Sequence, residues 1–407
     1  MLKIYKPEIT FTKTGTRIQA SFESDDIEDL LWFEVEDKYK DHLIDGRADG
    51  FVIALLIYAM ERGFDIQVLC PMSKKLYYTV NKYLVPLLSD LNSYKNIKVH
   101  CNDLVSEPLL NKGGVGTGLS CGIDSFSTIV DHIGNGCPES YEVTYFTFFN
   151  VGSHGNSKEK SNILFRERAK KAQEVADQLG KELIIVNSNI PEILKSNFES
   201  THTLRSMSAV LVLQKLFNTY YYSSAVHANE FKLSKNSMGH YDIFNLSMLS
   251  TETTNLFSSC CTKTRVDKTR MVAEFKPSYK YLDVCVRSNS NCSTCYKCLR
   301  TLFTLELLGK LELYSSVFDL NKYYSERKLY IAKVIAFYKK DIFLREIYNE
   351  MKIRNFEVPL NVKIKAKYLK SKYELVSFFL GKGNYIRFKK VLSFVVSRLK
   401  NIQTNQY

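Results

Sequence analysis

The sequence predicts an α/β protein built on a doubly wound parallel sheet. Between residues 115 and 226, short apolar strands of about six residues alternate with helix-like segments of about ten to twenty residues. This alternation is the pattern of βαβ units, whose strands lie parallel. Polar clusters follow three of the strands, at Ser120–Ser125, Asn150–Asn156 and His227–Lys232. Because ligands bind at the carboxyl ends of strands in such sheets, these clusters are candidates for a site.

The elements of this central block follow from the spacing of its apolar residues. We expect a domain over residues 112–311, preceded by an exit loop at Asn111–Gly114. Its predicted strands are residues 115–119, 141–149, 182–187 and 221–226, and its predicted helices are residues 124–133, 161–179 and 203–220.

Residues 1–111 predict a smaller α/β or α+β domain. Strand-like pieces occupy residues 1–42, and an apolar helix from Ala48 to Arg62 is ended by Gly63. A buried strand at 65–70, an amphipathic helix at 73–91 and a strand at 96–101 complete the domain. No motif in it indicates a role, although it is expected to help select a substrate.

The chain is basic, and its basicity is concentrated in the last segment. The formal net charge is +13, and residues 312–407 hold 20 Lys plus Arg against 8 Asp plus Glu. Apolar residues spaced three or four apart predict that this segment is helical. A solvated helical face is the simplest interpretation. Nucleic acid, an anionic membrane surface or an acidic partner are the alternatives, and phosphate contacts would make binding to nucleic acid sensitive to salt.

The sequence favours a cytoplasmic protein without a membrane span. Its first residues, MLKIYKPEITF, lack the basic and then apolar layout of a secretion signal. The longest apolar run, Phe51–Met60, is shorter than the ~20 residues that a membrane helix needs.

Residues 118–126, GLSCGIDSF, predict a phosphate site where the first central strand turns into a helix. Small residues in such a turn expose backbone N–H groups, and the helix N-terminus adds partial positive charge. Ser120 and Ser125 can donate further hydrogen bonds. Asp124 would repel a bare phosphate, so its natural partner is a Mg²⁺ ion that bridges phosphate oxygens. Phosphates with a carboxylate-held metal indicate a nucleotide.

Three other patterns could account for this stretch. An aspartate with serine neighbours can simply cap an ordinary helix. A Walker A loop requires a lysine after its last glycine, and none is present. The glycines of residues 113–118 lack the G-x-G-x-x-G spacing, and they precede the strand instead of following it.

Four cysteines predict a metal centre. They lie within fourteen residues in the pattern C-x6-C-x2-C-x2-C, at Cys285, Cys292, Cys295 and Cys298. Four thiolates close a tetrahedral shell around Zn²⁺, which leaves no open position for a substrate and predicts a structural role. Buried cysteines, a redox pair and an iron–sulfur cluster are the alternatives.

The stretch SCGIDS resembles the S-G-G-x-D-S signature of the PP-loop ATP pyrophosphatases, whose loop holds the pyrophosphate of ATP. Ser120, Gly122, Asp124 and Ser125 match, whereas Cys121 stands where that family usually has glycine. The cysteine spacing is similar to the zinc knuckle of 7-cyano-7-deazaguanine synthases within the same superfamily. The resemblance covers about residues 113–311 and implies an adenine nucleotide alpha hydrolase-like fold with added N- and C-terminal segments.

The resemblance also implies roles for individual residues. Asp124 would hold Mg²⁺, and Ser125 and Lys268 would act with it on the phosphates, with Arg265 as a second phosphate clamp. The implied nucleotide and substrate contacts are Ser120, Cys121, Gly122, Asp124, Ser125, Asn150, His227, Asn229 and Glu230. Each of the two regions also has an alternative interpretation. The residues around 229 would form a polar loop without a functional role, and those around 268 a solvated, basic helix start.

The implied activity is that of an ATP-dependent ligase forming a C–N bond. ATP would adenylate a carboxylate or carbonyl oxygen of a small, purine-like substrate, and ammonia or an amine would displace AMP. A tRNA-modifying PP-loop sulfurtransferase and a degenerate nucleotide-binding scaffold or sensor are the alternatives. A homodimer is a further expectation.

Overall fold

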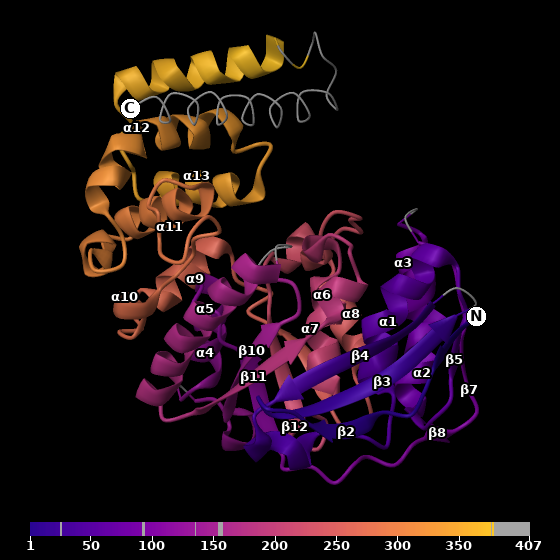
Figure 1. Ribbon diagram of the computed structural model, residues 1–407. Helices are drawn as coiled ribbons and strands as arrows, with labels where there is room; N and C mark the ends of the chain where they lie inside the picture. Colours follow the sequence, from indigo (N-terminus) through magenta and orange to yellow (C-terminus); the bar gives the residue numbers. More distant parts are fainter. Residues whose placement is uncertain (25–26, 92–93, 135, 154–157, 376, 378–407) are drawn as a thin grey trace, which may run out of the picture. The chain divides into compact units, whose positions relative to one another are not determined.

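The computed structural model describes residues 1–24, 27–91, 94–134, 136–153, 158–375 and 377 (Figure 1). Residues 378–407 of the predicted basic segment, and residues 154–156 of the second polar cluster, lie outside this description. The chain divides into two compact units. The first comprises Met1–Cys292 with Lys310–Phe318, and the second comprises Ser293–Gly309 with Asp319–Tyr407.

Five parallel strands form the centre of the first unit's sheet. They are β9 (Gly114–Gly118), β10 (Tyr145–Asn150), β11 (Glu182–Ser188), β12 (Phe217–Ser223) and β13 (Asn255–Ser259). Their order across the sheet is β13-β12-β9-β10-β11, and each neighbouring pair is parallel. Strands β10 and β11 follow β9 on one side of it, whereas β12 and β13 follow on the other side. The strand order therefore reverses between β9 and β12.

Strand β9 is built largely from glycine because large rings cross its face. A Cβ on Gly116 would lie 2.6 Å from the ring of Phe217 and 2.7 Å from that of Tyr220. Both aromatic side chains are buried in β12. Glycine at this position therefore lets the aromatic residues of β12 pack against β9.

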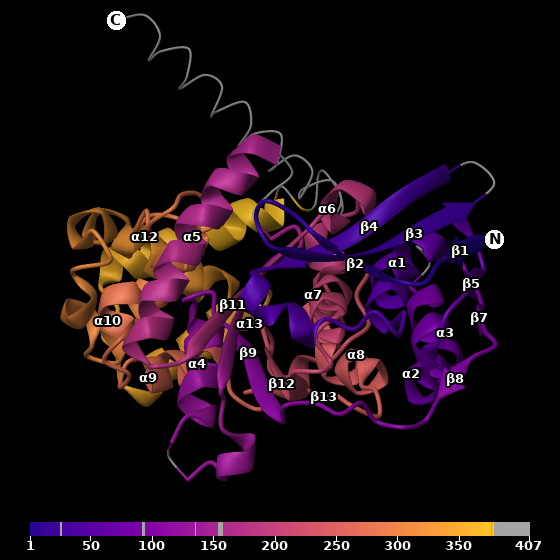
Figure 2. The ribbon, with the colours of Figure 1, turned by 60° about the horizontal axis from the view of Figure 1, so that its bottom comes forward.

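Helices cover both faces of these five strands (Figure 2). Helices α4 (Ile123–His132) and α5 (Lys158–Gln178) lie on one face, and α7 (His202–Leu211) and α8 (Asp242–Leu249) lie on the other. Right-handed crossovers from a reversed strand order place helices in this way. The remaining helices of this part are α6 (Ile190–Ile193), α9 (Arg265–Val272), which packs on α4, and α10 (Ser278–Tyr281).

The predicted helix over residues 203–220 was too long. Helix α7 ends at Leu211, and residues 217–220 belong to β12. The apolar run between them fits a buried helix as well as a buried strand, so its periodicity could not decide the boundary. Phe217 and Thr219–Tyr221 pair with β9, and Thr219–Ser223 pair with β13, and this pairing extends the strand toward the N-terminus.

The N-terminal strands continue the same sheet. Strand β11 pairs antiparallel with β4, and the order continues β4-β3-β1-β5-β7, with β2 on β3. These strands are β1 (Leu2–Ile4), β2 (Glu8–Phe11), β3 (Thr16–Ser24), β4 (Ile27–Val35), β5 (Ile66–Val68) and β7 (Val99–Cys101), and β6 (Met72–Ser73) pairs separately with β8 (Leu104–Val105). The protein is thus α/β with a mostly parallel central sheet, and a separate role for residues 1–111 stays a prediction.

Helix α1 (Asp49–Arg62) joins these strands to the central part. It ends at Gly63 with φ 76°, as the sequence predicted. A Cβ on Gly50 would lie 2.8 Å from the carbonyl oxygen of Ser208 in α7, so glycine allows the two helices to approach closely. Buried Asp49 accepts hydrogen bonds from the Ser73 N–H at 2.8 Å and from the Gln214 amide at 2.9 Å.

The predicted helix over residues 73–91 is divided. It consists of α2 (Lys74–Thr79), the π-helical turn η2 (Val80–Leu84) and α3 (Val85–Ser89). Pro86 lies in the first turn of α3, where its missing N–H is tolerated. Short 3₁₀ turns complete the first unit: η1 (Asp37–His42), η3 (Glu139–Tyr141), η4 (Phe198–Ser200), η5 (Ala228–Glu230), η6 (Met238–His240) and η7 (Leu311–Tyr314).

The second unit is helical, as predicted for the segment that the structure describes. It contains α11 (Tyr296–Leu307), α12 (Leu320–Phe337), α13 (Ile342–Ile353) and a helix over residues 360–375. The Phe303 ring packs edge-on against Tyr330 and Phe356. Among the described helices, none combines the length and the apolar character needed to cross a membrane.

Candidate functional site

The loop between β9 and α4 is a tight turn closed by Ser125. The Ser125 hydroxyl accepts the Ser120 N–H at 3.1 Å and donates to the Gly118 carbonyl oxygen at 2.9 Å. Ser125 is buried, whereas Ser120 is exposed. The N-cap of α4 is Gly122, which provides no side-chain cap. The N-terminus of α4 thus carries its partial positive charge without a capping side chain, at the strand end where the sheet order reverses.

Cys121 shapes this turn instead of offering a reactive thiol. Its φ is 59°, a left-handed conformation that glycine adopts at lower cost. Its carbonyl oxygen accepts the Asp283 N–H at 2.9 Å, and its side chain is buried. Burial raises the pKa of the Cys121 thiol to about 12, so the thiol is neutral near pH 7. A neutral thiol is a poor nucleophile.

Asp124, in the first turn of α4, lies between two cations of α9. Its Oδ2 is 2.7 Å from Arg265 Nη1, and its Oδ1 is 3.5 Å from Lys268 Nζ. The sequence singled out all three residues, and the structure brings them together although they are 141 and 144 residues apart. The cluster carries one negative and two positive charges, which leaves it net positive.

Lys268 is the most deeply buried charge in this cluster. Only 1% of its side chain is exposed, and its ammonium group donates a hydrogen bond to the Ser224 carbonyl oxygen at the end of β12. Burial lowers the pKa of Lys268, and the Asp124 carboxylate opposes that shift. Arg265 also donates to β12's exit loop, at the Ala225 carbonyl oxygen, 3.1 Å away. The two cations are therefore held by backbone oxygens beside the reversal point of the sheet.

A capping box fixes the start of α9 and so positions both cations. The Thr264 hydroxyl accepts the Asp267 N–H at 3.0 Å, and the Asp267 carboxylate accepts the Thr264 N–H at 3.1 Å. This reciprocal pair satisfies two N–H groups at the helix start. The basic helix start of the sequence is therefore a fixed local structure, with Lys268 turned inward instead of toward solvent.

Asn150 ends β10 at the same edge of the sheet, but its side chain is engaged with a neighbour. Its amide donates to Asn187 Oδ1 at 2.8 Å across the β10–β11 pair.

In the following loop, Arg205 of α7 donates to the Val151 carbonyl oxygen at 3.3 Å. Gly152 has φ 113°, and a Cβ there would lie 2.6 Å from the Arg205 guanidinium. The loop after β10 is thus shaped by a buried arginine that the sequence analysis did not single out.

The loop after β12 forms a short helical turn around the other predicted contacts. His227 Nδ1 accepts the Asn229 N–H at 3.0 Å and caps η5, while Ala228 N–H donates to the Cys261 carbonyl oxygen at 2.7 Å. Asn229 is exposed, and Glu230 is half-buried. These three residues lie at the carboxyl edge of β12, and their contact with a ligand stays a prediction.

A buried polar cluster on the α7 and α8 side of this edge was missed. His202 Nδ1 lies 2.6 Å from the Tyr222 hydroxyl, and the Thr203 hydroxyl donates to Asp242. Burial lowers the pKa of His202 to about 4 and raises the pKa of Asp242 to about 7, against the effect of the Thr203 hydrogen bond. His202 and Thr203 contact residues that are 20 and 39 positions away in the sequence, so no local pattern predicts the cluster.

Replacing Asp242 by asparagine should change how stability depends on pH. Between about pH 4 and 7 the native carboxyl keeps a proton that the unfolded chain releases, so Asp242 lowers stability as pH rises. His202 acts oppositely up to about pH 6.5, because the unfolded chain binds a proton that the native state excludes. With Asp242→Asn, the free energy of unfolding should rise more steeply over this window, by up to about 1.4 kcal/mol per pH unit. Urea unfolding at several pH values measures this slope, and a slope equal to wild type would contradict the assignment.

The four predicted metal ligands form one cluster. The sulfur atoms of Cys285, Cys292, Cys295 and Cys298 all lie within 4.8 Å of one another. Burial raises the pKa of Cys285, but hydrogen bonds from the Ser288 hydroxyl and from backbone N–H groups outweigh it and bring that pKa to about 6. A thiolate at this position is the form that binds metal. The cluster can hold a metal ion such as zinc.

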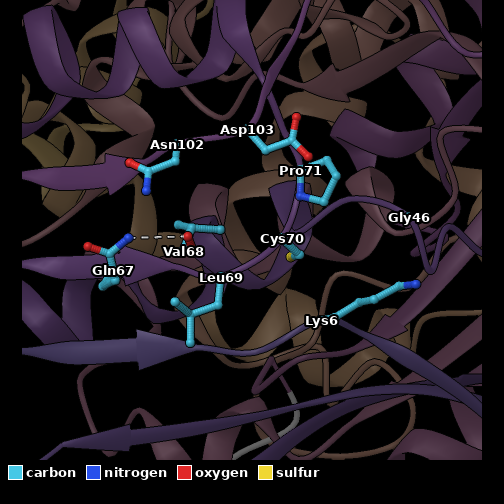
Figure 3. Close-up of a pocket in the computed structure, with 9 residues that line it drawn as sticks. All are labelled: Lys6, Gly46, Gln67, Val68, Leu69, Cys70, Pro71, Asn102 and Asp103. Atoms are coloured by element: carbon cyan, nitrogen blue, oxygen red, sulfur yellow. Dashed lines mark hydrogen bonds between the residues drawn. The ribbon is translucent and has the colours of Figure 1, made fainter.

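A separate cavity of about 520 Å³ opens among the N-terminal strands (Figure 3). It lies where β1, β5 and β7 end, and Figure 3 shows Lys6 and Asp103 on different sides of it. Its lining residues are Lys6, Gly46, Gln67, Val68, Leu69, Cys70, Pro71, Asn102 and Asp103. No site was predicted there from the sequence, because each lining residue is an ordinary loop or strand residue when read alone.

Comparison with known proteins gives no relative on which to base a function. No protein-family profile, no curated protein and no solved structure matches the chain.

Proposed function

We propose that the protein is an ATP-dependent ligase that activates an acid by adenylation. The observation that carries this proposal is the position of Asp124, which lies in the first turn of α4 between Arg265 and Lys268. In open α/β sheets, nucleotides bind where the strand order reverses, and this cluster lies at such a point. The resemblance of Ser120–Ser125 to the PP-loop signature supports the same site.

The charges of the cluster suit a polyphosphate. The net positive cluster, the uncapped N-terminus of α4 and the exposed Ser120 all favour an anion. Arg265 can bind two phosphate oxygens at once, and Lys268 supplies a point charge. The sheet order and the two helical layers fit a doubly wound, adenine nucleotide alpha hydrolase-like fold, which is part of this proposal.

Asp124 also fits the role of a magnesium ligand. About 27% of its side chain is exposed, and carboxylate oxygen is a donor that Mg²⁺ prefers. When bound, Mg²⁺ would neutralise charge on the phosphate oxygens. Arg265 and Lys268 could then exchange their contacts with Asp124 for contacts with phosphate, which would release the carboxylate.

The proposed reaction has two steps. An oxygen of the substrate carboxylate attacks the α-phosphorus of ATP, and the bond from that phosphorus to the bridging oxygen of pyrophosphate breaks. Ammonia or an amine then attacks the acyl carbon, AMP leaves with the oxygen, and a proton is released. The turn at residues 120–125 and the α9 cations would stabilise the negative charge that develops on pyrophosphate.

A purine-like substrate, a homodimer and a cytoplasmic location belong to the same proposal.

The cysteines support adenylation over sulfur transfer. A sulfurtransferase needs a reactive thiol at the nucleotide site, but Cys121 and Cys260 are buried, and burial raises their pKa values to about 12 and about 11, so both thiols are neutral near pH 7. Four further cysteines are gathered in the metal cluster. A nucleotide-binding scaffold without turnover remains the other outcome of the test below.

Replacing Asp124 by asparagine should separate magnesium binding from phosphate binding. The variant should bind ATP in EDTA at least as tightly as wild type, because Arg265 and Lys268 lose their internal anion. With Mg²⁺ and a metabolite extract, AMP formation should fall by about 100-fold or more. Calorimetry measures the binding, and labelled ATP measures the AMP.

Asp131→Asn, on the same helix but outside the cluster, is the matched control and should behave as wild type. Full AMP formation by Asp124→Asn would refute the role of that carboxylate. Tight binding of ATP without turnover in any extract would favour the scaffold.

A further inference from the structure

The helix over residues 360–375 in the second unit has two apolar faces, and the described part of the chain packs against one of them. The Pro359 carbonyl oxygen accepts the Val362 N–H at 3.0 Å at the start of this helix. Its packed face carries Val362 and Ala366, each 2% exposed, and Tyr373, whose ring lies 5.6 Å from that of Phe337 in α12.

The second apolar face points to solvent. Leu360, Ile364, Tyr368 and Leu375 are 73%, 59%, 61% and 62% exposed. At 3.6 residues per turn, these four positions fall within an arc of roughly 80°, on the side opposite to the packed face. A surface helix normally carries polar residues there, so four large exposed apolar side chains in one stripe need an explanation.

Lysines border this stripe on both sides. Lys363, Lys367 and Lys370 lie along one border, and Lys365 and Lys372 lie along the other, by the same helical spacing. All five are exposed, and Glu374 is the one acidic residue among positions 360–375. The arrangement is that of a helix lying on a lipid surface, where apolar residues enter the acyl boundary and lysines reach the headgroups.

We propose that this face of residues 360–375 binds the surface of a membrane that contains anionic lipids. Charge complementarity selects the anionic headgroups, and the apolar stripe selects a bilayer over nucleic acid. Nucleic acid phosphates would pair with the lysines, but they would leave Leu360 and Ile364 in water. A bilayer accepts both groups at once. The helix would lie in the interface and would not span the membrane.

Co-sedimentation of the full chain with lipid vesicles tests this proposal. The protein should pellet with vesicles of phosphatidylcholine plus phosphatidylserine, and much less with phosphatidylcholine alone. The double variant Leu360→Gln, Ile364→Gln should weaken vesicle binding by about tenfold or more, because two buried aliphatic side chains are lost. The double variant Lys365→Gln, Lys372→Gln should weaken it by roughly fivefold per lysine, and added salt should reduce the difference between the lipids.

Leu110→Gln is the matched control, because it removes a side chain that is 96% exposed on a loop elsewhere. It should bind vesicles as wild type does, and circular dichroism should show that every variant keeps its helices. The proposal is overturned if the chain ignores anionic vesicles, or if the Leu360, Ile364 variant binds them as tightly as wild type. Binding of single-stranded RNA in place of vesicles, unchanged by that double variant, would likewise overturn it in favour of nucleic acid.

Discussion

Replacing Lys268 by methionine is expected to remove most of the proposed ATP-dependent activity while the protein stays folded. The Lys268 ammonium group is almost fully buried beside Asp124. Because of this burial, a lysine or arginine on the surface cannot take its place in the variant. Methionine fills a similar volume without the charge. A preorganised charge that stabilises a leaving group is worth about 10² to 10³ in rate, so AMP formation should fall by that factor.

ATP binding separates this variant from Asp124→Asn. Lys268→Met should weaken ATP binding both with Mg²⁺ and in EDTA, because in the proposed site the lost ammonium group would contact phosphate directly. Burial disfavours the ammonium ion, so its removal should leave the free energy of unfolding within about 2 kcal/mol of wild type. Lys263→Met, at an exposed position in the preceding turn, provides the control and should keep full activity. Equal ATP affinity in Lys268→Met and wild type would exclude the phosphate contact.

The turn after β9 could be predicted because its signals are local. Glycines before it, a serine–aspartate pair within it and an apolar helix after it all lie within about a dozen residues. The same holds for the end of α1 at Gly63, where a left-handed glycine stops the helix. The prediction of the helix–strand boundary near residue 217 was wrong for the opposite reason. That boundary depends on pairing with β9, which lies about 100 residues away in the sequence.

The partners within the site were predictable only as candidates. The PP-loop resemblance implied Mg²⁺ binding by Asp124 and phosphate binding by Lys268, but the contact between these two side chains depends on α9 packing against α4. Arg205, His202 and Asp242 were not singled out, because their contacts join positions that are far apart in the sequence. A buried charge of this kind must find partners, and tertiary structure supplies them. No local feature of the sequence indicated that β11 pairs antiparallel with β4.

Replacing Cys298 by serine should abolish metal binding and loosen the segment that carries the other ligands. Residues 282–295 contain no helix or strand, so they depend on the cluster, on hydrogen bonds and on the ion pair between Lys171 and Asp283 at 2.7 Å. Asn291 provides some of that support, since its amide donates to the Leu282 carbonyl oxygen at 2.7 Å and accepts the Val284 N–H at 2.9 Å. Structural zinc sites contribute about 10 kcal/mol or more of binding free energy, which is folding free energy in a loop of this type.

Metal analysis and limited proteolysis measure the two effects. Wild type should contain one zinc ion per chain and should resist cleavage between residues 282 and 298. Cys298→Ser should contain no zinc and should be cut within that range, while Cys261→Ser, which alters a cysteine outside the cluster, should match wild type. Stoichiometric iron with visible absorption would identify an iron–sulfur cluster instead. Because a closed four-thiolate shell would offer no open ligand position, we expect zinc loss to expose the segment before it affects the proposed ATP binding at Asp124. Loss of ATP binding with an intact, protease-resistant segment would contradict a purely structural metal.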